Sequence, residues 1–163
     1  MKAPICCKRW VRSSLLILAV VALVSIRASS QSLTPLYHWA YPNNGDQLYI
    51  TDSSSPGSGW NYIEITGYVY TTQVDGTVQL ARYYHPTYGI HFYTLACCDI
   101  GGGWVYEGPC CYVYNPQIVG TVPLFRYYDS HGIFGTHYYT TQQGGPGYPW
   151  DTYEGVEGYV SPP

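Results

Sequence analysis

Short runs of alternating apolar and polar residues fill the chain from about residue 35 onward, and Gly, Pro, Asn or Asp interrupts them every few positions. Such alternation is typical of half-buried β-strands, and clusters of these interrupting residues mark the turns between strands. No long stretch shows the period of an amphipathic helix. The pattern therefore predicts an all-β chain with many turns.

The alternating runs recur as three similar units of about 35–78, 79–122 and 123–163. The units begin with LYHWAYPNNGDQLYIT, LARYYHPTYGIHFYT and LFRYYDSHGIFGTHYYT. Two aromatic positions recur at spacings of 44 and 46 residues: Tyr49, Tyr93 and Tyr139, and Trp60, Trp104 and Trp150. Three copies at one period indicate a repeat architecture.

Each unit contains about four short strand candidates, so the three units predict about twelve strands around a pseudo-threefold axis. This arithmetic favours a β-trefoil-like fold. A propeller normally has at least four blades, and an open solenoid needs caps that the sequence does not show.

Alternation also assigns side chains to the two faces of the strands. In the first strand of each unit the apolar face carries Tyr37 and Trp39, Ala81 and Tyr83, or Phe125 and Tyr127. The opposite face carries His38, Arg82 and Arg126. On this assignment Tyr83 and Phe92 belong to the core. His85, matched by Tyr41 and Asp129 in the other units, is expected at the surface.

Residues 1–30 differ in kind from the rest of the chain. Four basic residues precede the apolar run LLILAVVALVSI, and small residues follow it. This order predicts a secretory signal peptide cleaved after Ser30, with a signal anchor as the alternative. The apolar run is shorter than the roughly 20 residues of a membrane span. We therefore expect a secreted, extracellular protein with one domain over 31–163.

Cleavage would change the charge of the protein considerably. Arg82 and Arg126 are the only Lys or Arg residues after position 30, against ten Asp and Glu, which makes the formal charge 2 − 10 = −8. Phosphate backbones are bound mainly through Lys and Arg. Nucleic acid and anionic membranes are therefore not expected as partners, and no cofactor is expected.

Four cysteines remain after the signal segment: Cys97, Cys98, Cys110 and Cys111. An even number in an exported chain predicts disulfides, here two cross-links between the pairs with the connectivity left open. A metal site is the alternative. It is disfavoured because the segment between the pairs contains no histidine.

The two arginines are predicted to form ion pairs within their units. Units two and three have the motif YEG at Glu107 and Glu154, whereas unit one has Ile63 at that position. Unit one also lacks the arginine, with His38 in its place. Joint loss of both partners predicts the pairs Arg82–Glu107 and Arg126–Glu154. A clamp for a ligand carboxylate is the alternative role for these arginines.

Several motifs carry a family resemblance over about residues 35–160: HFYT, GWVYEG, CYVY and the linker GTVPLFRYY. They resemble a domain of unknown function, numbered 5648, whose units read approximately PLYRLYNPxTGDHFYTT…GYxYEGxxxYV. The resemblance implies a secreted domain with threefold aromatic repeats and no established chemistry. Unit one departs from the motif at His38, Gln47 and Ile63.

No local catalytic motif such as G-x-S-x-G or H-E-x-x-H occurs, so an enzyme is not expected. Recurring aromatic and polar residues suit carbohydrate recognition, because sugar rings stack on aromatic faces and repeated weak sites gain from multivalency. The candidate ligand-binding residues are Asn44, Asp46, Gln47, Trp60, Tyr88, His91, Trp104, His131, His137 and Trp150.

Other interpretations of these residues remain open. A recurring tryptophan is often a core residue, and a histidine among tyrosines often bonds a turn. The chain could instead be a disulfide-stapled domain for protein interaction, matrix or defence, or an enzyme or accessory domain of a hydrolase. Glycans or an extracellular protein are the expected partners.

Overall fold

The computed structural model describes residues 31–96, 99–130, 135–145 and 151–163. These residues form β-strands and no helix, which confirms the all-β prediction. The strands are β1 (Thr34–Tyr41), β2 (Asp46–Ile50), β3 (Asn61–Val69), β4 (Thr77–His85), β5 (Ile90–Thr94), β6 (Val105–Tyr114), β7 (Val122–Asp129), β8 (Thr136–Thr140) and β9 (Asp151–Val160). Within this part of the chain, nothing has the length and apolar character of a membrane-spanning helix.

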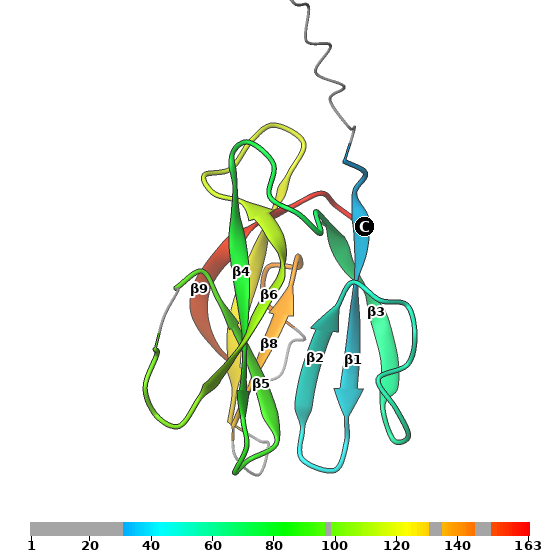
Figure 1. Cartoon of the computed structure of the whole chain (residues 1–163), viewed down its shortest axis with the longest axis vertical. Helices are drawn as coiled ribbons and strands as arrows, with labels where there is room; N and C mark the ends of the chain where they lie inside the picture. The colour runs from blue at the N-terminus through cyan, green and yellow to red at the C-terminus, as the bar shows by residue number, and fades with distance from the viewer. Residues whose placement is uncertain (1–30, 97–98, 131–134, 146–150) are drawn as a thin grey trace, which may run out of the picture.

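Each third of the chain makes an antiparallel sheet of three strands with its first strand in the middle, in the orders β2-β1-β3, β5-β4-β6 and β8-β7-β9. The first is a separate sheet, and the other two join through β6 and β9 into a sheet of six strands. Figure 1 shows the smaller sheet standing beside the larger one.

The described residues thus contain nine strands rather than the twelve expected of a β-trefoil. The difference arises after the recurring tryptophan, where glycines suggest a turn in the sequence. Gly67, Gly108 and Gly155 instead lie inside the long strands β3, β6 and β9, so each of these segments is one strand.

β-bulges in the long strands explain how a glycine is tolerated there. In the pairing of β4 with β6, Arg82 lies opposite Gly108 and Tyr83 lies opposite Tyr106. Glu107 is therefore an extra residue that has no residue opposite it in β4. The pairing of β7 with β9 leaves out Glu154 in the same way. Such an extra residue bends its strand and re-aims its side chain. Gly108, with φ of 112°, follows the bulge in a conformation that suits glycine.

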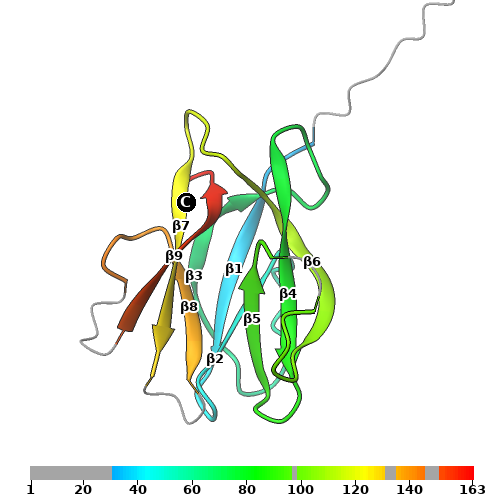
Figure 2. The same cartoon turned by 90° about the vertical axis from the view of Figure 1, so that its left-hand side faces the viewer.

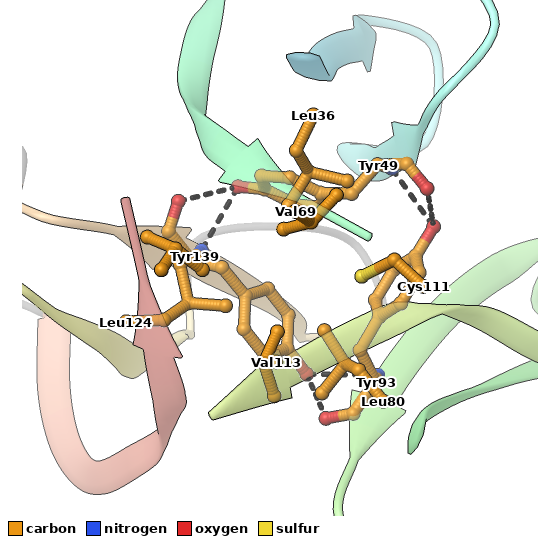
Figure 3. Close-up of a cluster of buried hydrophobic side chains, with 10 residues drawn as sticks. Leu36, Tyr49, Val69, Leu80, Tyr93, Cys111, Val113, Leu124 and Tyr139 are labelled. Carbon is orange, nitrogen blue, oxygen red and sulfur yellow. Dashed lines mark hydrogen bonds between the residues drawn. The ribbon is translucent and has the colours of Figure 1, made fainter. Parts of the chain in front are cut away.

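Three leucines, three tyrosines and three valines, one of each from every unit, make up most of the core. The core residues are Leu36, Leu80 and Leu124, Tyr49, Tyr93 and Tyr139, and Val69, Val113 and Val160, together with Cys111. All are at most 1% exposed. Figure 3 shows this cluster with the tyrosines around its centre.

The three buried tyrosines, which we call the tyrosine triad, are joined in a closed cycle of hydrogen bonds (Figure 3). The Tyr93 hydroxyl accepts from Tyr49 N at 2.8 Å and donates to Tyr49 O at 3.1 Å. The Tyr139 hydroxyl bonds the backbone of Tyr93 in the same way, and the Tyr49 hydroxyl bonds that of Tyr139. The rings meet edge to face, with centroids 5.2–5.5 Å apart.

The triad supplies hydrogen-bond partners for backbone groups at the edges of the sheets. Strands β2, β5 and β8 are all edge strands, and each offers the N–H and C=O of its triad tyrosine on the side without a neighbouring strand. A buried edge needs partners for these groups. Because the hydroxyls bond from β8 to β5, the two edges of the six-stranded sheet are brought together, which curls the sheet (Figure 2).

The face of the first strands that carries His38, Arg82 and Arg126, opposite the predicted apolar face, is also turned toward the interior. His38 is 1% exposed and its ring stacks on Tyr49 at 4.4 Å. Arg82 and Arg126 lie in register opposite the other two triad tyrosines, Tyr93 and Tyr139. The predicted apolar face is also buried at Tyr83, so both faces of the first strands are covered. Alternation fails as a guide because neither face is solvated.

Candidate functional site

Hairpin turns of identical form place the first group of predicted site residues. In both the β1–β2 and the β4–β5 turn a glycine donates its N–H back over four residues, Gly45 to Tyr41 O at 3.0 Å and Gly89 to His85 O at 2.7 Å. Their φ values of 81° and 67° lie in the left-handed region, which glycine adopts without strain. The turns of units one and two are in direct contact, because the Asn44 amide donates to Gly89 O at 2.8 Å.

Asp46 and His91 form the centre of this contact, which we call the first junction. The Asp46 carboxylate is 1% exposed and accepts from His91 N at 2.7 Å and from His91 Nδ1 at 2.6 Å. Trp60 and Tyr84 flank the His91 ring, at centroid distances of 6.5 and 5.1 Å. The first junction therefore brings together predicted site residues, but their polar atoms hold unit one to unit two.

Asn44 and Tyr88 belong to the same contact, since the Asn44 amide also donates to Tyr88 O at 3.2 Å. Gln47 lies apart from them and accepts a hydrogen bond from His38 Nε2 at 2.6 Å. Burial lowers the pKa of His38 to about 4, against the opposing effect of the Gln47 hydrogen bond. His38 is therefore neutral at physiological pH, and the half-buried Gln47 is its hydrogen-bond partner.

The equivalent contact between units two and three, the second junction, is open. Ile90 occupies the position of Asp46 there, and His137 occupies that of His91. Because isoleucine offers no carboxylate, the two units are not joined by a counterpart of the Asp46–His91 pair. A cavity of about 320 Å³ lies here, lined by Phe92, Ile100, Trp104 and His137.

The rings around the cavity are held in place by one another. Trp104 meets the edge of His85 at 5.2 Å and lies 5.5 Å from Phe92. Phe92 also meets His137 at 4.6 Å. The predicted surface position of His85 is wrong, since this residue is 8% exposed. Its ring bonds Gly102 O at 2.9 Å and packs against Trp104. Phe92 is only partly buried, as a cavity wall rather than a core residue.

A charged cluster adjoins His137 at the second junction. The Arg126 guanidinium lies 5.0 Å from the centroid of the Phe92 ring and bonds Glu154 through Nε at 2.7 Å. Glu154 Oε2 is also 3.4 Å from His137 Nε2. Burial lowers the pKa of His137 to about 4, although Glu154 acts in the opposite sense. The neutral ring has a buried Nδ1 atom without a hydrogen-bond partner among the described residues.

Both arginine–glutamate pairs predicted from the repeats are present. Arg82 Nε lies 2.8 Å from Glu107 Oε2, and Arg126 Nε lies 2.7 Å from Glu154 Oε2. The bulges described above turn the two glutamates toward the arginines. Arg126 additionally pairs with Glu157, whose carboxylate accepts from Leu95 N at 2.9 Å. Neither guanidinium is free of a carboxylate.

Some predicted residues lie outside the described part of the chain: His131, Trp150, Cys97 and Cys98. The predicted signal peptide lies there too. Cys110 and Cys111 are not bonded to each other, and the Cys110 thiol donates to Tyr49 O at 3.2 Å. The two predicted cross-links therefore stay a prediction. Within the described ranges, no group of three His, Cys, Asp or Glu side chains could hold a metal ion.

A second pocket, of about 430 Å³, is lined by Gln73, Val78, Gln79, Leu95 and Tyr112. None of the predicted site residues lines it. The sequence interpretation also missed three exposed tyrosines that recur in the units: Tyr62, Tyr106 and Tyr153. They follow the recurring tryptophan by two or three residues, and that regular spacing was the available signal.

Comparison with known proteins agrees with the motifs. Neither a curated protein nor a solved structure matches the chain. A family model described as a domain of unknown function (DUF5648) matches residues 21–99 and 97–161. These segments cover most of the sequence and confirm the predicted resemblance, so the chain belongs to the DUF5648 family.

Proposed function

We propose that the protein is a secreted, non-enzymatic module that binds carbohydrate in the cavity of the second junction. The observation that carries the proposal is the composition of the cavity wall. Phe92 and Trp104 offer aromatic surface, and His137 with the neighbouring Glu154 and Arg126 offers polar groups at one side. Sites for small ligands are commonly apolar with a few placed polar groups.

The ring positions suit a sugar better than a fully apolar ligand. The C–H face of a pyranose would pack on Trp104, which His85 and Phe92 hold in place. Hydroxyl groups would meet the neutral His137 ring and the Glu154 carboxylate. Hydrogen bonds to a charged carboxylate are stronger than neutral ones, which favours a hydroxyl-rich ligand.

The charge of the chain narrows the class of sugar. Arg82 and Arg126 are the only cations after residue 30, and both are engaged by carboxylates. A sulfated or uronic acid ligand would find no uncommitted positive partner and would meet a net negative protein. We therefore propose neutral glycans as the ligands.

A glycan array with the purified protein, verified as folded by circular dichroism, provides the first test. Affinities of the bound glycans are then measured by calorimetry for Trp104→Ala and for Trp60→Ala, the matched control. Trp60 is the counterpart at the first junction, where the Asp46–His91 pair fills the contact.

The Trp104 variant should bind about tenfold more weakly or worse, because central aromatic contacts commonly carry more than about 1 kcal/mol. The Trp60 variant should bind normally. A silent array, or equal losses in the two variants, would refute the proposed site.

Two wider proposals accompany this function. First, the three units are copies of one ancestral unit about a pseudo-threefold axis, supported by their identical strand orders and by the tyrosine triad. A chain of three identical copies of unit two should then fold, and its failure would count against the proposal. Second, export should yield a product whose N-terminal sequencing begins near Gln31; a product retaining residues 1–30 would contradict cleavage there.

A further inference from the structure

Three tyrosines at equivalent positions of the three units are about half exposed. Tyr62, Tyr106 and Tyr153 have exposed fractions of 51%, 48% and 54%. Each lies one residue before the bulge position on its long strand, in β3, β6 and β9. Their distance from the recurring tryptophan differs, since unit three carries one more residue than unit two between the tryptophan and this tyrosine. The three tyrosines are therefore equivalent by their place in the strands.

Each exposed ring rests on a buried aromatic ring of the neighbouring strand. The pairs are Trp39 with Tyr62, Tyr83 with Tyr106, and Tyr127 with Tyr153, with centroids 5.4 Å apart in every unit. The partners also lie directly opposite each other in the strand register. An exposed ring packed in this way is already ordered, so a ligand that stacks on it loses little conformational entropy.

The arrangement differs from a protein-binding face. Stable protein interfaces cover about 800 Å² per partner as one continuous patch. Here the exposed rings belong to three separate units that surround the tyrosine triad, and Figure 1 shows the lower parts of β3 and β9 spread apart, on the right and on the left of the molecule. Three small, equivalent aromatic surfaces suit a ligand that repeats the same chemical group along its length.

We propose that Tyr62, Tyr106 and Tyr153 are three equivalent stacking platforms for an extended neutral polysaccharide, in addition to the cavity of the second junction. Each platform binds the apolar face of one sugar residue, and neighbouring segments or chains of the polymer occupy the other platforms. The formal charge of −8 for residues 31–163 and the engagement of both arginines by carboxylates leave no partner for polyanionic chains. The inference rests on the proposed carbohydrate function but concerns a different surface.

Affinity electrophoresis tests the platforms directly, because an acidic protein migrates readily and is retarded by a polysaccharide cast into the gel. The probes are soluble galactomannan, xyloglucan, mixed-linkage β-glucan and dextran, with dextran sulfate as the charged comparison. At least one neutral polymer should retard the full chain, and dextran sulfate should not.

Variants then separate the platforms from the cavity. Each single Tyr→Ala variant should weaken retardation by a similar factor of about tenfold or less, and the triple variant by about 10²-fold or more, as expected for multivalent binding. Tyr→Phe at all three positions preserves stacking and should preserve most of the retardation. Val119→Ala, at a fully exposed apolar residue outside the platforms, is the matched control and should have no effect.

Several outcomes would overturn the inference: no retardation by any neutral polymer, unchanged retardation of the triple variant, or an effect confined to one tyrosine. A concentration-dependent dimer in sedimentation that the triple variant lacks would identify a second copy as the occupant instead. Trp104→Ala should remain retarded. If it alone abolishes retardation, the cavity binds carbohydrate and the platforms do not.

Discussion

Replacing Tyr139 with phenylalanine tests the role of the tyrosine triad, because it removes one hydroxyl and keeps the ring. The hydroxyl of Tyr139 accepts from Tyr93 N at 2.8 Å and donates to Tyr93 O at 2.6 Å. Both backbone groups face away from β4 at the edge strand β5, and Tyr93 is 1% exposed. Water cannot readily replace the hydroxyl there.

The expected cost follows from the two groups left unpaired. An unsatisfied buried donor or acceptor costs about 1–3 kcal/mol, so the two groups that Tyr139→Phe leaves unpaired should lower the free energy of unfolding by about 2–6 kcal/mol. In the reduced protein, Tyr93→Phe should cost less, because Tyr49 O keeps its hydrogen bond from the Cys110 thiol at 3.2 Å. Domains of this size have a total stability of only about 5–15 kcal/mol, so the loss is readily measured.

Guanidinium unfolding followed by tryptophan fluorescence gives the free energy for each variant. Tyr106→Phe is the matched control, since the side chain is 48% exposed and its loss of a hydroxyl should change stability by about 0.5 kcal/mol or less. If Tyr139→Phe proves as stable as Tyr106→Phe, the hydroxyls of the triad do not satisfy the sheet edges and the reasoning is wrong.

Three further predictions concern the remaining polar contacts. Asp46→Ala should lower the free energy of unfolding by about 2–3 kcal/mol, because it leaves His91 N unpaired at the first junction; an unchanged thermal melt would contradict this, with Asn43→Ala as control. Arg126→Met should destabilise more than Arg82→Met in denaturant titrations, because Arg126 is less exposed and binds two carboxylates; equal effects would show that Glu157 adds nothing. Burial lowers the pKa of His38 from 6.5 to about 4, because the folded protein disfavours the charged ring. The neutral ring therefore contributes its full share to the free energy of unfolding above pH 6.5. This share, about 3 kcal/mol in total, is lost as the pH falls toward 4. Unfolding at a series of pH values should show this fall and a smaller one in His38→Gln, and identical curves would exclude His38 as the cause.

The repeats made the ion pairs predictable from residue types and spacing alone. Arg82 and Glu107 are both replaced in unit one, so the sequence contains its own comparison of a paired and an unpaired unit. The same comparison could not show how the glutamate reaches the arginine. That depends on a bulge at Glu107, and a bulge is a property of strand register rather than of residue type.

The residue types of the candidate site could be predicted from the sequence, but which junction is closed and which contains a cavity could not. His91 and His137 occupy equivalent positions, yet one is held by Asp46 and the other lines a cavity. Asp46 and Ile90 differ visibly in the sequence. That this difference closes one junction and opens the next could not be inferred from either unit alone, because each junction is shared by two units.

The sequence by itself determined the secondary structure class, the period of the units and the pairing of charges, since alternation, spacing and joint replacement are local or repeated signals. The tertiary structure alone decided which side chains meet at the centre of the molecule. By alternation, Tyr49 and Tyr93 lie on the same strand face as Gln47 and His91, which makes that face look polar in the sequence. The triad tyrosines nevertheless lie in the core. Their hydroxyls complete the hydrogen bonds of three edge strands that meet there, and the need for those bonds exists only once the sheets are assembled.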